Sequence, residues 1–212
     1  MTREAAFLTK LAERPDDRSL RLVFADWLLD QGDERGEVIS LWARGGLSLT
    51  ERRRTAKITS ARAVAWLGPL APLADLQRTR FVGGFLDELV CGPGRSPELF
   101  AALTGEPRLA TVRALTVPPN REPVSLGGFL AHPVLRRVNR LRLGSTDWQD
   151  LRLFRVEPEG LRPSQVVVGS WGRFHAELAP LSNVALFKQA RAVGLSTTEF
   201  MSPQVVGELL RA

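Results

Sequence analysis

The feature that constrains this chain most is an apolar pattern that recurs every 26 residues from residue 83 onward. Each copy has four ladder positions, the first, fourth, seventh and ninth, and the five copies begin at Gly83, Leu109, Leu135, Leu161 and Phe187. Of these 20 positions 17 are apolar, whereas about nine would be expected from the overall apolar fraction of 44%. The pattern predicts a repeated unit that buries its ladder against its neighbours.

A period of 26 is typical of leucine-rich repeats, in which each unit contributes one short strand and one returning helix. Helical or turn-like spacing between the ladders predicts return segments at 96–103, 126–131, 150–154 and 174–181. Only the second copy has the asparagine expected after the strand, Asn120, and the fourth, with Ser164 and Gly169 in ladder positions, is expected to be distorted. The segment 203–210 is predicted to cap the end of the solenoid.

The first third of the chain has helical periodicity. Apolar residues predict a helix from residue 3 to about 13, ended by Pro15, and a second helix that begins after Asp16–Asp17 and ends at Gly32. A third segment runs from Gly36 to Gly45, and a longer helix is predicted over 50–67, with Ile58, Ala61, Ala65 and Trp66 on one face. These short helices are expected to pack together.

Four strings in this region are specific: Pro15-Asp16-Asp17, Leu20-Arg21-Leu22-Val23-Phe24-Ala25-Asp26-Trp27-Leu28, Gly32-Asp33 and Arg35-Gly36-Glu37. They resemble the bacterial repeat-companion domain over about residues 4–42, with Phe24 where that family often has Tyr. The family typically precedes leucine-rich-like repeats and has no enzymatic activity attached to it. Together with the 26-residue pattern, the resemblance implies an α/β protein with a helical unit, residues 1–80, and a leucine-rich-repeat-like solenoid of about five repeats, residues 81–212. The helical unit is expected to cap the solenoid, because the exposed edge of the first repeat would otherwise promote aggregation.

The open strand face of such a solenoid is the predicted functional surface. Alternation along each strand directs the positions beside the ladder residues outward. A face of small and apolar residues with a few charges is typical of a protein-binding surface. We therefore expect a non-enzymatic adaptor or scaffold that binds another protein through this face, at Glu88, Val90, Thr116, Arg140, Arg142, Val166, Val168 and Ser170.

Other residues could be assembled into sites, but structural roles are favoured. Asp26, Asp33, Arg35 and Glu37 could form an acidic metal or catalytic site. Asp33 and Arg35, however, lie in the turn after Gly32, where Asp33 can satisfy backbone donors and Arg35 can pair with a carboxylate on the preceding helix. Trp148 and Trp171 follow strands and are interpreted as packing residues, with anchoring of a partner as the alternative.

The charge leaves a second function open. The formal net charge is +6 and the sequence pI about 10.8, and 26 of the 29 basic residues are Arg. A GC-rich genome produces that excess of Arg through codon usage. The alternative is an arginine-driven nucleic-acid-binding protein using Arg52, Arg53, Arg54, Arg136, Arg137, Arg140 and Arg142, although no aromatic platform alternates with these residues.

Catalytic, metal and cofactor sites are not predicted. Cys91 is the single cysteine, which excludes an internal disulfide and favours a cytoplasmic location. Cys91 paired with His132 or His175 as a thiol nucleophile remains an alternative, as does a hydrolase of another kind, but Cys91 occupies a ladder position where a thiol behaves as a small apolar group. No stretch has the roughly 18 apolar residues that cross a bilayer, so no membrane insertion is expected.

Overall fold

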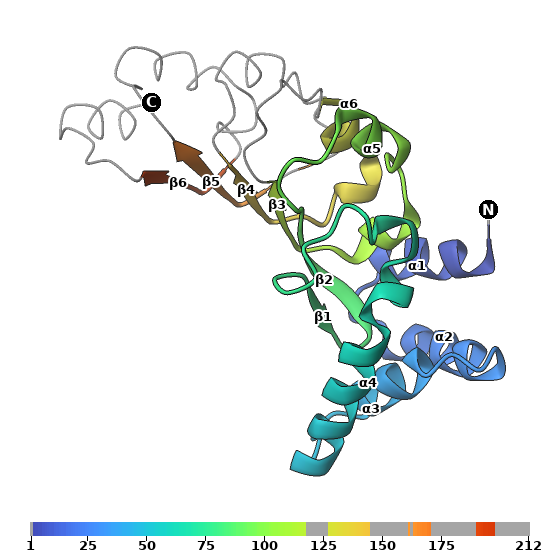
Figure 1. Cartoon of the computed structure of the whole chain (residues 1–212). Helices are drawn as coiled ribbons and strands as arrows, with labels where there is room; N and C mark the ends of the chain where they lie inside the picture. Colours follow the sequence, from blue (N-terminus) through green and yellow to red (C-terminus); the bar gives the residue numbers. More distant parts are fainter. Residues whose placement is uncertain (1, 118–126, 145–160, 162, 171–189, 198–212) are drawn as a thin grey trace.

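The computed structural model describes residues 2–117, 127–144, 161, 163–170 and 190–197, with the backbone alone for 168–170 and 193–197. Helices occupy one end of this part of the chain, and a mixed sheet extends away from them (Figure 1). The chain is therefore α/β, as predicted. None of the described helices is long and apolar enough to span a membrane.

The four N-terminal helices agree with the sequence prediction. They are α1 (Arg3–Glu13), α2 (Arg18–Asp30), α3 (Arg35–Arg44) and α4 (Leu49–Leu67). Before α1, α2 and α4 the side chain of the preceding residue accepts a hydrogen bond from a free backbone N–H group, as Asp17 does from Leu20 N at 2.9 Å. Ser48 and Glu51 form a reciprocal capping box that fixes the start of α4.

The sheet has six strands in sequence order: β1 (Arg80–Val82), β2 (Phe85–Val90), β3 (Ala114–Val117), β4 (Arg140–Leu143), β5 (Gln165–Ser170) and β6 (Ala192–Thr197). Strands β2 to β6 are parallel. Strand β1, which the sequence did not predict, pairs antiparallel with β2 through a turn at Gly83 and Gly84, both with positive φ. This pairing leaves β1 at the edge of the sheet.

The register follows the period of the apolar pattern at first and then departs from it. Leu89 pairs with Leu115 and Leu115 with Leu141, so each of these pairs is separated by one full period. Leu141, however, pairs with Val166, which comes one residue too early, and Val166 pairs with Val193, which comes one residue too late. The predicted ladder position Val167 is thus wrong by one residue, and β6 restores the original phase.

Short helices cover one face of the sheet. They are α5 (Pro97–Ala102), α6 (Gly127–Ala131) and the 3-10 turns η1 (Gly68–Leu70), η2 (Pro107–Thr111) and η3 (Pro133–Leu135). The return segments predicted at 96–103 and 126–131 are confirmed, and Phe100 and Phe129 join them edge to face with ring centroids 5.4 Å apart. The segments predicted at 150–154, 174–181 and 203–210 lie outside the described residues.

Two groups of buried side chains hold these layers together. The sheet core lies between the strands and the short helices and is built mainly from ladder residues, among them Leu89, Leu115 and Leu141. The helical core joins α1, α2 and α3 through Leu8, Leu11, Phe24, Ala25, Leu28 and Ile39, and it includes Phe85 of β2. Phe85 therefore joins the helical unit to the first parallel strand.

Arg35 makes a second connection between the helices and the sheet. Its side chain is 3% exposed, its Nε donates to the carbonyl of Gly84 at 2.6 Å, and its Nη1 lies 3.1 Å from Glu4 Oε1. The guanidinium also lies 5.7 Å from the ring centroids of Phe24 and Phe85. The predicted partner on the preceding helix was wrong, because Arg35 pairs across the fold with α1 and the β1–β2 turn.

Candidate protein-binding surfaces

The outer face of the parallel strands holds part of the predicted surface. Arg140 and Arg142 of β4 are exposed, and Glu88 and Thr116 are half-buried. Val90 is buried, with Thr79 Oγ1 accepting its backbone N–H at 3.3 Å. The structure thus brings together four of the predicted residues as a mainly polar strip, and Val90, which is in register with Thr116, is buried beside it.

The one-residue shift in register changes the predicted surface on β5. Val166 is fully buried in the sheet core, so its predicted position on the open face is wrong. Gln165 and Val167 are the residues in register with Arg140 and Arg142 on the outer face. Val168 pairs with Leu143 and Ser170 with Thr197, and the side chains of both lie outside the description. Trp148 and Trp171 are also outside it.

The arginines of the second predicted function are partly neutralised. Arg136 pairs with Glu13 at 3.4 Å, and Arg113, beside the same strands, pairs with Asp87. Burial lowers the pKa of Arg137, and the nearby charges of Arg113 and Arg21 lower it further. Because carboxylates are interspersed with these cations, the group lacks the uniform positive stripe that follows a phosphate backbone.

Residues considered for catalysis have structural surroundings. Cys91 is buried, and burial raises the pKa of its thiol to about 12, so the thiolate that a nucleophile needs is disfavoured. His132 Nδ1 accepts the backbone N–H of Val134 at 3.2 Å at the start of η3, and His175 lies outside the described residues. Within the described part of the chain no group of three or more His, Cys, Asp or Glu side chains could hold a metal ion.

The polar residues of the motif after α2 form a turn, as expected. Asp33 Oδ1 accepts the backbone N–H of Arg35 at 2.9 Å and the indole N–H of Trp66 at 3.2 Å. Glu37 pairs with Arg54 of α4. These contacts fix α3 and α4 relative to each other, which supports a structural role for the motif.

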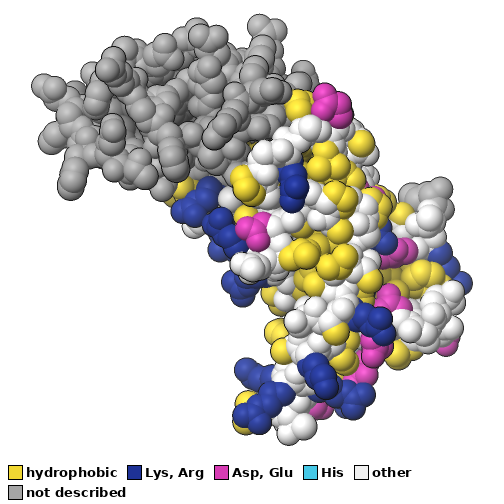
Figure 2. Space-filling view, in the orientation of Figure 1, with side chains coloured by type: hydrophobic (Ala, Val, Ile, Leu, Met, Phe, Trp, Pro, Cys, Tyr) yellow, Lys and Arg dark blue, Asp and Glu magenta, His cyan; other side chains and the backbone are white. Residues whose placement is uncertain are grey.

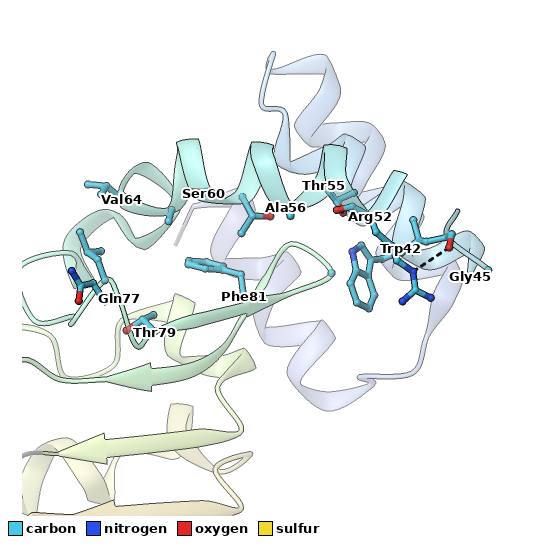
Figure 3. Close-up of a pocket in the computed structure, with 16 residues that line it drawn as sticks. Trp42, Gly45, Arg52, Thr55, Ala56, Ser60, Val64, Gln77, Thr79 and Phe81 are labelled. Carbon is cyan, nitrogen blue, oxygen red and sulfur yellow. Dashed lines mark hydrogen bonds between the residues drawn. The ribbon is translucent and has the colours of Figure 1, made fainter. Parts of the chain in front are cut away.

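A groove that the sequence analysis did not predict lies between α4 and β1 (Figure 3). Its volume is about 930 Å³. The residues of α4 that line it recur at spacings of three and four, so they form one stripe along the helix. This stripe consists of mainly small side chains: Arg52, Thr55, Ala56, Thr59, Ser60, Ala63 and Val64.

Alternate residues of β1 and its flanks, Thr79, Phe81 and Gly83, form the opposite wall. Phe81 projects toward α4 in the middle of the groove, and its ring meets Trp66 edge to face at 5.7 Å (Figure 3). At one end Trp42 packs against Gly83, where an added Cβ would lie 3.3 Å from the Trp42 side chain. The small size of Gly83 thus lets the indole form the end of the groove.

Exposed apolar side chains are concentrated in this groove. Trp42, Val64 and Leu76 are 44%, 54% and 49% exposed, and all three line it. Only three other large apolar side chains of the described residues are exposed, and they are Val23, Leu29 and Leu49. Exposed apolar surface gathered in a concave site marks a place where another molecule binds.

The charge of the groove is positive. Arg52 is its single charged lining residue, and its Nε donates to the carbonyl of Leu47 at 3.2 Å (Figure 3). Nearby carboxylates are engaged elsewhere, since Glu34 pairs with Arg62 and Glu51 with Arg44. Arg and Lys side chains gather around the end of the molecule formed by α3 and α4 (Figure 2).

The sequence signal for this groove was present but was interpreted differently. Ala61 and Ala65, expected on the apolar face of α4, are exposed, whereas Thr55 is buried. The stripe of small residues at 55, 56, 59, 60 and 63 could have indicated a helix face that leaves room for a ligand. Strand β1 was missed because three residues give too short a pattern to show alternation.

Comparison of the chain with protein-family models, with curated proteins and with solved structures found no match.

Proposed function

We propose that this chain is a non-enzymatic protein-binding module in which the helical unit caps a leucine-rich-repeat-like solenoid. Parallel strands in sequence order, spaced close to the period of the apolar pattern and with short helices on one face, support the repeat architecture. The resemblance of residues 4–42 to the repeat-companion domain supports it independently. The single buried cysteine is compatible with a role in the bacterial cytoplasm.

The groove between α4 and β1 is the observation that carries the binding function. It gathers three exposed apolar side chains, Trp42, Val64 and Leu76, and the described residues of its lining include no carboxylate, His or Cys that could activate a lining hydroxyl such as that of Ser60. Trp is enriched among the residues that dominate the energy of protein interfaces. The exposed strip with Arg140 and Arg142 is a second contact region for a large partner.

Capture of partners tests the proposal when it is combined with a blocked groove. The full chain is used as bait in a lysate of the organism that makes it, with and without nuclease and at two salt concentrations. Ala63→Arg fills the groove, and Ala65→Arg places the same side chain on the same helix outside it. We expect a nuclease-resistant protein that Ala65→Arg retains and Ala63→Arg loses.

Two results would contradict this function. Recovery of nucleic acid that is lost at higher salt would favour the arginine-driven alternative. A partner retained equally by both variants would remove the groove from the proposal. The capping role has its own test, because it predicts one cooperative unit: hydrogen exchange showing that residues 1–80 open independently of the sheet would refute it.

A further inference from the structure

We propose that the groove binds an extended acidic segment of a partner protein, which adds as a strand to the free edge of β1. This inference rests on the proposed protein-binding function and specifies the kind of partner. It depends on three observations: the unpaired edge of β1, the length and small side chains of the opposite wall, and the sign of the charge around the groove.

The first observation is the edge itself. In the described residues β1 pairs only with β2 and has no strand on its other side, where α4 lies across the groove (Figure 3). An edge strand presents backbone N–H and C=O groups that a second extended chain can satisfy. Peptides that bind in this way take their affinity from main-chain hydrogen bonds and their specificity from alternate side chains.

The second observation is the size of the opposite wall. The stripe on α4 runs from Arg52 to Val64, which corresponds to about 18 Å along a helix axis. An extended chain rises about 3.3 Å per residue, so five or six residues match this length. Small residues such as Ala56, Ser60 and Ala63 line this wall, so the α4 side chains take up little of the groove.

The third observation is the charge. Arg52 lies in the groove, and Arg78 and Arg80 flank Thr79 at the start of β1. The side chain of Arg80 is 68% exposed and is 4.0 Å from Glu88, and Arg78 forms no ion pair with any described residue. These cations oppose pairing with the same edge of a second copy and complement carboxylates on an incoming strand.

The expected ligand follows from these walls. Apolar side chains at alternate positions would contact Phe81 and Trp42, which offer the aromatic surface of the groove. Carboxylates at the intervening positions would face the solvent side, close to Arg52 at one end and to Arg78 and Arg80 along the edge. A helical ligand would instead show apolar residues at spacings of three and four.

Selection from a display library of random twelve-residue peptides, with the full chain as bait, tests this proposal. We expect the enriched peptides to alternate apolar residues with Asp or Glu and to be depleted in Lys and Arg. Methylation of single backbone nitrogens in one selected peptide should weaken binding at every second residue, because in a strand alternate N–H groups point to the same neighbour.

Three variants of exposed alanines on α4 separate charge from size. Ala56→Glu and Ala56→Gln introduce side chains of equal size into the groove, and Ala61→Glu introduces the same carboxylate outside it. We expect Ala56→Glu to weaken a selected peptide about tenfold more than Ala56→Gln does, and Ala61→Glu to leave its affinity almost unchanged. Unaltered thermal unfolding of each variant shows that the fold is kept.

The remaining outcomes are distinguishable. Peptides that depend on the groove but have helical spacing, no preference for acidic residues or no alternation in the methylation scan would overturn the strand-addition proposal and leave the protein-binding function intact. Peptides that bind Ala56→Glu and Ala56→Gln as well as they bind the original chain would show that the groove is not the binding site, which contradicts both the strand-addition proposal and the role of the groove in the proposed function. If no peptide is enriched, or if the chain dimerises through this groove, an acidic peptide is not the ligand.

Discussion

The helical core and the sheet core each have a buried titratable side chain, but its surroundings are polar and aromatic in the first and apolar in the second. Arg35 beside the helical core contacts Glu4, the Gly84 carbonyl and two aromatic rings. Burial lowers the pKa of its guanidinium, and the charges of Glu4 and Asp33 oppose that shift. Cys91 in the sheet core has apolar surroundings, and burial raises the pKa of its thiol to about 12. The burial of Arg35 therefore depends on directional contacts, whereas the burial of Cys91 depends on close packing of apolar side chains.

Loss of volume in the sheet core should have the largest effect. Leu115 is 1% exposed and lies in the middle of the ladder between Leu89 and Leu141. We expect Leu115→Ala to lower the free energy of unfolding by about 4 kcal/mol, because it removes buried apolar surface and leaves a cavity. Urea unfolding measures the change. The exposed Val23→Ala is the control, and a similar small loss in both would contradict the assignment of the core.

Loss of the directional contacts of Arg35 should rank second. Arg35→Met keeps much of the volume but leaves the Gly84 carbonyl without its donor, whereas Glu4 still pairs with Arg108 at 2.9 Å. We expect a loss of about 3 kcal/mol in the same urea experiment. Arg62→Met removes an exposed, solvent-screened ion pair with Glu34 and should leave the urea midpoint almost unchanged. Equal effects would show that Arg35 does not connect the helices to the sheet.

A glycine in each region sharpens the comparison further. A Cβ at Gly36 of α3 would lie 2.4 Å from the Ala25 carbonyl oxygen, whereas one at Gly128 of α6 would meet nothing within 4 Å. Gly36→Ala should destabilise the protein by about 2 kcal/mol through overpacking. Gly128→Ala should stabilise it by about 0.5 kcal/mol through helix propensity. Thermal unfolding of both variants measures these changes, and destabilisation by Gly128→Ala would contradict the described α6.

Ionisation of the Cys91 thiol should have the smallest effect on stability, because it begins only above neutral pH. Its pKa is raised from 9.0 to about 12, so its contribution to stability is fully present below pH 9 and is lost between pH 9 and about 12 as the unfolded thiol ionises. Alkylation by iodoacetamide at pH 8 should be slow in the folded protein and fast in urea. Rapid labelling of the folded chain would restore the thiol nucleophile as an alternative.

Much of the fold followed from local sequence patterns. The N-terminal helices were predictable because their apolar stripes, caps and glycine ends act within a few residues of each other. The first parallel strands were predictable because Leu89, Leu115 and Leu141 repeat at a constant interval. The same constant interval failed at β5, where Val166, Val167 and Val168 are all apolar and β-branched, so the sequence contains no alternation that could fix which face each one joins.

The candidate site was less accessible to sequence analysis. The groove depends on Trp42, Val64, Leu76 and Phe81, which are distant in the chain and come together only through the packing of α4 beside β1. The true partners of Arg35, Glu4 and Gly84, are likewise 31 and 49 residues away. Contacts of this kind have no local periodicity, so composition and spacing could not reveal them.

The compensating steps in register have a consequence for how such a chain can change over time. The connection from Leu141 to Val166 is one residue shorter than the period and the connection from Val166 to Val193 is one residue longer, yet all three residues pair in one row of the sheet. A residue lost from one connection and gained in the next therefore leaves the inner and outer faces of every strand in place. A slip inside a strand has the opposite effect, because it would move the buried side chains of that strand to the outer face.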